Sequence, residues 1–208
     1  MRSVSVVVAI VGVLALVACG GGKRATRNAP AGPASSRLQV LAATDLPGRL
    51  RPGRVRVVHA VAPVLASLDP TLRAVSFATA LRGARVASAA VETLRRRSDG
   101  ALAGYSVAVR VRSSAAAVAA AQSLEQVLIA PCVGTCLATM RRFDVPGVAA
   151  ALGADRVAAA GRARPAHVFY VVVPVATNVF VEAFSTPPQT ADTEVATATA
   201  GLVRRLTR

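Results

Sequence analysis

The chain contains no tryptophan, and only 3% of its 208 residues are aromatic. Apolar residues still make up 53% of the sequence, and most of them are valine, leucine and alanine. Because alanine buries little surface, we expect the core to stabilise the fold less per residue than an average core does. A chain of this length suits one domain, or at most two small ones.

Sequence motifs for catalysis and cofactor binding are missing as well. The chain has no G-x-S-x-G, H-E-x-x-H, Walker A or G-x-G-x-x-G pattern. Its 10 acidic residues are too sparse to predict a carboxylate pair or a calcium loop. We therefore expect no cofactor, and the sequence favours a non-catalytic role over an enzyme.

An apolar segment without charge occupies the start of the chain. Arg2 precedes a run over residues 4–17 that is shorter than the ~20 residues a transmembrane helix needs. Its length and flanks predict a signal peptide. Residues 20–36, rich in Gly, Pro, Ala and Ser, have no apolar period and predict a flexible tether.

The run ends in Leu16, Val17, Ala18, Cys19 and Gly20, which together resemble the lipobox of bacterial lipoproteins. The resemblance implies that the thiol of Cys19 is acylated and that signal peptidase II removes residues 1–18. It further implies attachment to the outer face of the cell membrane by palmitate-like chains. An ordinary signal peptide or an uncleaved anchor is the alternative. With its tether and its Ala/Arg bias, the chain looks like the small α+β lipoproteins of actinobacterial envelopes.

Positive charge dominates, with 25 Lys and Arg residues and a formal net charge of +15. Nearly all of it is arginine, since Lys23 is the only lysine. For an exported protein, the available polyanions are lipid headgroups and cell-wall polymers, and nucleic acid is not an expected partner. The alternative is a solvated surface that follows from composition alone. The clusters considered are Arg95–Arg97, Arg141–Arg142, and Arg204, Arg205 and Arg208.

Residues 37–208 predict a single α+β domain, with an antiparallel sheet and helices packed on one face. The clearest strand covers residues 104–112, where Tyr105 and every second residue share a face. Residues 167–173 and 178–184 predict two more strands, and residues 37–42, 54–61 and 73–79 predict weaker ones. Residues 84–97 fit either a helix or a hairpin partner of the strand at 104–112.

Two helices are expected as well. The first is N-capped by Ser113 or Ser114 and runs to about Ile129, with an apolar face of Val118, Leu124, Val127 and Leu128. The second covers residues 190–206, with Asp192 and Glu194 in its first turn and Arg204 and Arg205 in its last. The stretch between Pro131 and residue 166 predicts a loop region.

Two cysteines remain after Cys19. Export places Cys132 and Cys136 where disulfides persist, so a local disulfide between them is our first interpretation. The spacing Cys-x-x-x-Cys with a distant histidine also resembles the copper site of Sco-type chaperones. That resemblance implies Cys132, Cys136 and His167 (or His59) as soft ligands, which makes a redox or metal-handling protein the alternative function. The proline that usually follows such a motif is replaced by Leu137.

Overall fold

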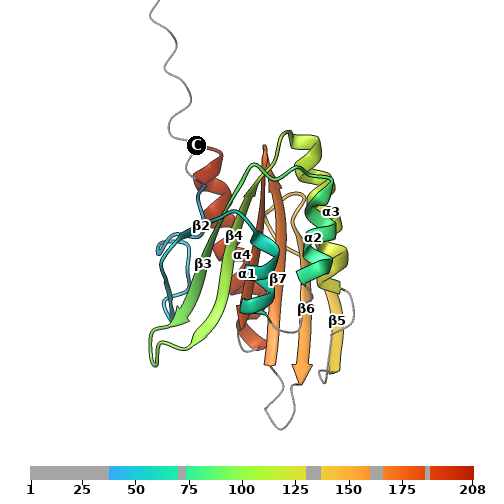
Figure 1. Ribbon diagram of the computed structural model, residues 1–208. Helices are drawn as coiled ribbons and strands as arrows, with labels where there is room; N and C mark the ends of the chain where they lie inside the picture. Colours follow the sequence, from blue (N-terminus) through green and yellow to red (C-terminus); the bar gives the residue numbers. More distant parts are fainter. Residues whose placement is uncertain (1–37, 70–73, 130–136, 160–165, 186–187) are drawn as a thin grey trace, which may run out of the picture. The chain divides into compact units, whose positions relative to one another are not determined.

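One antiparallel sheet organises the fold (Figure 1). The computed structural model describes residues 38–69, 74–129, 137–159, 166–185 and 188–208. Its strands are β1 (Leu50–Pro52), β2 (Arg56–Val58), β3 (Ser88–Arg96), β4 (Leu102–Arg110), β5 (Leu137–Asp144), β6 (Leu152–Ala159), β7 (Ala166–Val175) and β8 (Asn178–Ser185). They lie in the order β1-β3-β4-β8-β7-β6-β5, and β2 also pairs with β3.

Four helices accompany the described sheet: α1 (Val61–Leu68), α2 (Ala74–Arg82), α3 (Ser114–Ile129) and α4 (Pro188–Leu206). None of them is both long and apolar enough to cross a membrane, within the described part of the chain. Residues 37–208 make up one compact unit that contains every described element and both apolar cores. We therefore treat this unit as able to fold by itself.

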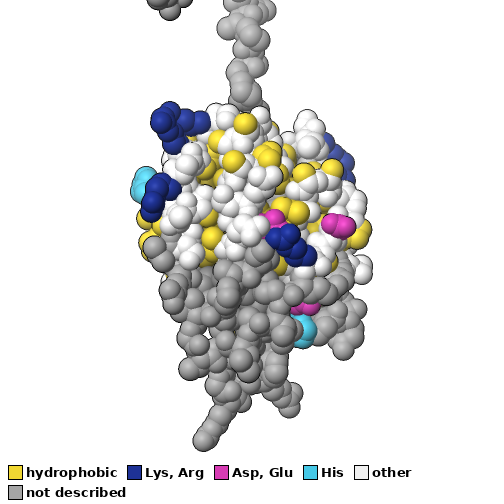
Figure 2. Space-filling model, turned by 90° about the vertical axis from the view of Figure 1, so that its right-hand side faces the viewer, with side chains coloured by type: hydrophobic (Ala, Val, Ile, Leu, Met, Phe, Trp, Pro, Cys, Tyr) yellow, Lys and Arg dark blue, Asp and Glu magenta, His cyan; other side chains and the backbone are white. Residues whose placement is uncertain are grey.

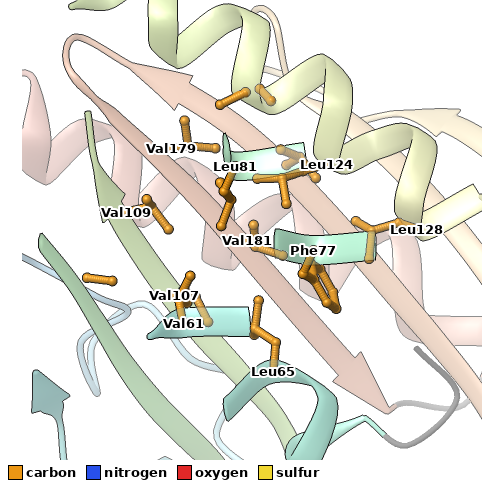
Figure 3. Packing of buried hydrophobic residues seen from close by; sticks show 14 of the residues in the cluster. Val61, Leu65, Phe77, Leu81, Val107, Val109, Leu124, Leu128, Val179 and Val181 are labelled. Carbon is orange, nitrogen blue, oxygen red and sulfur yellow. The ribbon is translucent and has the colours of Figure 1, made fainter. Parts of the chain in front are cut away.

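The first core lies between the sheet and helices α1, α2 and α3 (Figure 3). Phe77 of α2 and Leu124 of α3 are fully buried against Val107 of β4 and Val181 of β8. Alanines on the inner side of α3 add to this core, which lets the helix approach the sheet closely. They are Ala117, Ala120 and Ala121.

The second core lies on the opposite face of the sheet, under α4. Val195 and Leu202 of α4 are fully buried against Phe180 and Phe184 of β8. The segment that precedes β1 contributes Leu41, and the loop between β5 and β6 also packs here. The α+β class and the antiparallel sheet are confirmed, but helices cover both faces rather than one. The reason is that β4, β7 and β8 are apolar on both sides, so each face needs a cover.

The expected strands at residues 73–79 and 37–42 are not formed where these residues are described, and the expected loop between Pro131 and residue 166 contains strands. Residues 73–79 fall largely within helix α2, whose Phe77 packs into the first core. Residues 37–42 form no strand where they are described, although Val40 and Leu41 are buried. The expected loop region contains the antiparallel hairpin β5–β6, and the expected strand at 54–61 is reduced to β2, after which α1 begins.

The other elements are confirmed. β4, β7 and β8 match the expected strands, and residues 84–97 contain β3, the hairpin partner of β4. α3 begins at Ser114, and the Oγ of Ser113 accepts a hydrogen bond from the Ala116 N–H at 3.2 Å, as an N-cap does. α4 begins at Pro188, so the expectation of Asp192 and Glu194 in its first turn is wrong: both lie beyond it.

Candidate functional site

A hollow of the described surface lies between α2 and α3. It has a volume of about 440 Å³ and is lined by Ser76, Thr79, Ala80, Ser123, Gln126 and Val127. A smaller hollow of about 170 Å³ shares Thr79, Ala80 and Ser123 and continues along the same helix pair. No lining side chain carries a charge. We call this feature the helix-pair groove.

The charged residues of the two helices, Arg82 of α2 and Glu125 of α3, do not line this groove. Figure 2 views the molecule from the side on which α3 and β5 lie in Figure 1. Over the coloured part of this face, apolar and uncharged atoms predominate and charged side chains are scattered. The groove therefore offers apolar contact with a few hydroxyl and amide groups, which suits an uncharged ligand.

A row of polar side chains, which we call the carboxyl row, crosses the middle of the sheet beneath α4. Glu92 of β3 lies opposite Ser106 of β4, which lies opposite Glu182 of β8. The Oγ1 of Thr199 on α4 donates a 2.7 Å hydrogen bond to the Oε2 of Glu182. The Oγ of Ser106 accepts a hydrogen bond from the Leu41 N–H at 3.2 Å.

Burial makes both carboxyl groups of this row weak acids. Burial raises the pKa of Glu182 to about 8 against the lowering effect of its bond from Thr199, and Asp45 adds a smaller repulsion. Burial likewise raises the pKa of Glu92 to about 7, while the charge of Arg205 opposes it. One oxygen of each group has no hydrogen-bond partner within the described structure. Below pH 7 the row is therefore largely protonated and uncharged.

An ion pair joins the C-terminal end of α4 to the segment before β1. Arg205 of α4 binds Asp45 at 2.5 Å and also donates to the Val40 carbonyl oxygen at 2.8 Å. The side chain of Asp45 is only 5% exposed. Gly201 makes the approach achievable, since a Cβ there would lie 2.8 Å from the Asp45 Oδ1. The pair fixes the segment before β1 to the C-terminal turn of α4.

Two further polar contacts lie on the other face. The hydroxyl of Tyr170 donates to Asp69 at the end of α1, and both residues are buried. Arg142 of β5 pairs with Glu125 of α3 at 3.2 Å. Both contacts join a helix to a strand, so they position helices over the sheet rather than form a reaction centre.

The histidines named as alternative metal ligands lie far apart. His167, at the start of β7, contacts Asp155 of β6 at 3.3 Å and stacks on Phe169. His59 is exposed just after β2. The register places them at opposite ends of the sheet and four strands apart, on the order of 30 Å. They cannot ligate the same ion.

Cys19, Cys132 and Cys136 lie outside the described residues. Within the described residues, no three His, Cys, Asp or Glu side chains are grouped to hold a metal ion. The structure thus leaves the lipidation site and the disulfide as predictions from the sequence.

Some arginines of the clusters named from the sequence are exposed, and others form ion pairs with buried carboxylates. Arg95, Arg96 and Arg97 are exposed at the end of the β3–β4 hairpin, and Arg204 and Arg208 are exposed at the end of the chain. Arg142 and Arg205 instead form the ion pairs described above, and the side chain of Arg141 lies outside the described part.

Sequence reasoning missed the helix-pair groove and the carboxyl row. The groove arises from tertiary packing of two helices, one of which was expected to be a strand. The row had a signal in Glu182, a lone carboxyl within the apolar run of residues 178–184. An acidic residue inside a strand that is apolar on both sides has to be buried.

Comparison with known proteins gives little beyond this geometry. No protein-family model matches the chain, and no curated protein matches it. Among solved structures, the extracellular domain of PknH from Mycobacterium tuberculosis is similar at a TM-score of 0.49 and 11% sequence identity. The match covers 81% of this chain and 100% of that one.

Proposed function

We propose that the protein is an exported lipoprotein, held to the outer face of a bacterial membrane by acyl chains on Cys19, whose domain binds a ligand. The observation that carries the anchor is the order of Arg2, the apolar run and the Leu16-Val17-Ala18-Cys19-Gly20 sequence. Two or three acyl chains at ~0.8 kcal/mol per buried methylene would hold the protein firmly on a bilayer.

The anchor is tested by expressing the full chain in a bacterium with lipoprotein processing and labelling it with alkyne-palmitate. We expect label in the membrane fraction for the unchanged protein. Cys19→Ser is expected to lose the label and the cleavage together. Cys132→Ser is the matched control and should keep both. Equal labelling of Cys19→Ser would contradict the anchor.

Export also supports the disulfide between Cys132 and Cys136, because the compartment outside the cytosol is oxidising. Alkylation of the exported protein without reductant should leave both thiols unmodified. Modification of both in the untreated protein would contradict this pairing.

The helix-pair groove supports the binding role. Its volume of about 440 Å³ lies in the range of small-molecule sites. Ala80 and Val127 supply apolar contact, while Ser76, Thr79, Ser123 and Gln126 supply neutral polar groups. This chemistry suits an uncharged, mainly apolar small molecule and disfavours ionic ligands, which would lose hydration without gaining a counter-charge.

The groove is tested with N-phenyl-1-naphthylamine, an uncharged apolar probe that fluoresces when it leaves water. We expect saturable fluorescence with the domain of residues 37–208. Ser123→Trp places a large ring where both hollows meet and should abolish the signal. The control is Gln122→Trp, an exposed neighbour on α3 that does not line the groove. Equal probe binding by both variants would contradict the binding role of the groove.

A further inference from the structure

Arginines gather along the edge of the sheet that β1 and β2 form beside β3, and none of them lines the helix-pair groove. Residues 50–58 run antiparallel along the outer side of β3, as β1 and then β2. The cluster comprises Arg51, Arg54 and Arg56 from this segment, Arg95 near the end of β3 and Arg97 just after it, all exposed. We call it the basic edge.

The register brings these charges together although they come from separate segments. Arg51 lies directly opposite Arg95, so two like charges face each other across β1 and β3. Arg56 lies opposite Val91, and since residues 91 and 95 of β3 share a face, Arg56 projects on the same side. Like charges opposite each other destabilise a sheet, so this arrangement is costly for the fold alone.

None of the five arginines of the basic edge forms an ion pair with a carboxylate in the described part of the chain. Arg95 and Arg97 donate only to the backbone carbonyl oxygens of Gly100 and Leu50. The nearby carboxylates form ion pairs with other arginines. Asp99 pairs with Arg96 at 2.7 Å, and Glu194 pairs with Arg49 at 2.5 Å. The basic edge therefore retains its full positive charge.

Exposed apolar side chains flank the same edge. Val55 and Val57 are 45% and 73% exposed; Val57 lies opposite Ala90, so it projects from the other side of the edge than Arg56, which lies opposite Val91. Leu102 is 47% exposed and lies opposite Arg95. Three of the four large hydrophobic residues exposed in the described surface thus belong to this edge. Cationic and apolar side chains mixed in this way are typical of surfaces that rest in a bilayer interface.

We infer that the basic edge binds anionic lipid headgroups, so that the domain rests with its β1–β2 edge on the membrane to which Cys19 is attached. The inference rests on the proposed anchor, because the tether of residues 20–36 keeps the domain within ~60 Å of the bilayer. The guanidinium groups would pair with phosphates while the valines and Leu102 enter the interface. A soluble anionic polymer would satisfy the arginines but leave the apolar side chains in water.

The test is sedimentation of the domain of residues 37–208 with vesicles. This domain lacks Cys19, so its behaviour is independent of acylation. We expect binding to vesicles of phosphatidylcholine with 30% phosphatidylglycerol, weaker binding at higher salt, and no binding to phosphatidylcholine alone. Binding to neither vesicle, or equal binding to both, would overturn the inference while leaving the anchor standing.

Two sets of variants test whether binding depends on the arginines of the basic edge or on the net charge of the whole domain. Arg51→Gln/Arg54→Gln/Arg56→Gln should weaken binding about a hundredfold, at roughly fivefold per arginine. Arg82→Gln/Arg204→Gln/Arg208→Gln removes the same charge from exposed arginines outside the edge and should have a much smaller effect. An equal loss in both would overturn the inference.

Removing the exposed apolar side chains distinguishes a membrane partner from a soluble polymer. Val55→Ser/Val57→Ser should weaken vesicle binding about tenfold and leave binding of soluble polyphosphate unchanged. If the variant loses nothing on vesicles, the partner is a polyanion rather than a bilayer, and the inference fails. Circular dichroism of each variant confirms that the sheet is intact.

Discussion

Glu182 and Glu92 are the residues whose ionisation the fold alters most. Their folded-state pKa values of about 8 and about 7 lie above the ordinary 4.5. Between pH 4.5 and about 8 the folded chain therefore binds more protons than the unfolded chain. The free energy of unfolding then falls as the pH rises through this range.

We predict that thermal unfolding shifts to lower temperature between pH 5 and pH 8.5. Glu182→Gln should flatten the upper part of this profile, because the amide does not titrate and still accepts the bond from Thr199. At pH 8.5 the variant should be more stable by on the order of 1 kcal/mol or more. Glu92→Gln should remove the loss of stability that occurs between pH 4.5 and about 7, because the pKa of Glu92 is about 7 in the folded chain. A profile that neither variant changes would contradict the burial of these carboxyl groups.

At the scale of the elements, α3 shows which of its side chains hold the helix on the sheet. Leu124 is fully buried beneath it, whereas Val118 is 46% exposed, although both were expected on the apolar face. We predict that Leu124→Ala costs about 2 to 5 kcal/mol of unfolding free energy. Val118→Ala should change it by less than about 0.5 kcal/mol. Urea unfolding measures both, and equal losses would contradict the placement of α3.

The elements that the sequence predicts well are those whose pattern has one interpretation. The alternation in β4 and the unbroken apolar run of β7 each fit only a strand, and Ser113 marks the start of α3. Residues 73–79 also alternate, with Val75 and Phe77 two apart, yet they fold mostly into α2 because packing against α3 buries Phe77. β5 and β6 are rich in Ala, Arg, Gly and Asp, which favour strands weakly. β6 becomes a strand by pairing with β7, and β5 by pairing with β6.

The candidate sites were harder to foresee than the elements. The arginines of residues 95–97 were visible as a run, but Arg51, Arg54 and Arg56 join them only through the pairing of β1 and β2 with β3. The groove and the carboxyl row likewise depend on contacts between distant segments. A single sequence carries the local periods that define elements but not the register that assembles sites.

At the scale of the molecule, the chain divides its chemistry among separate parts of one sheet. A charge-free groove lies over one face, the buried carboxyl row lies under α4, and the basic edge borders β3. The Asp45–Arg205 and Arg49–Glu194 pairs tie the segment before β1 to α4. These pairs fix the segment along α4, from Val40 and Asp45 near the end of the helix to Arg49 nearer its start.

The proposed anchor requires that Cys19 becomes the lipid-bearing first residue of the protein. Mass spectrometry of the N-terminal peptide, from protein purified out of bacterial membranes, tests it most directly. We expect a peptide that begins at Cys19 and carries a diacylglyceryl group, with or without a third acyl chain. A peptide that begins at Met1, or at any residue without lipid, would contradict it.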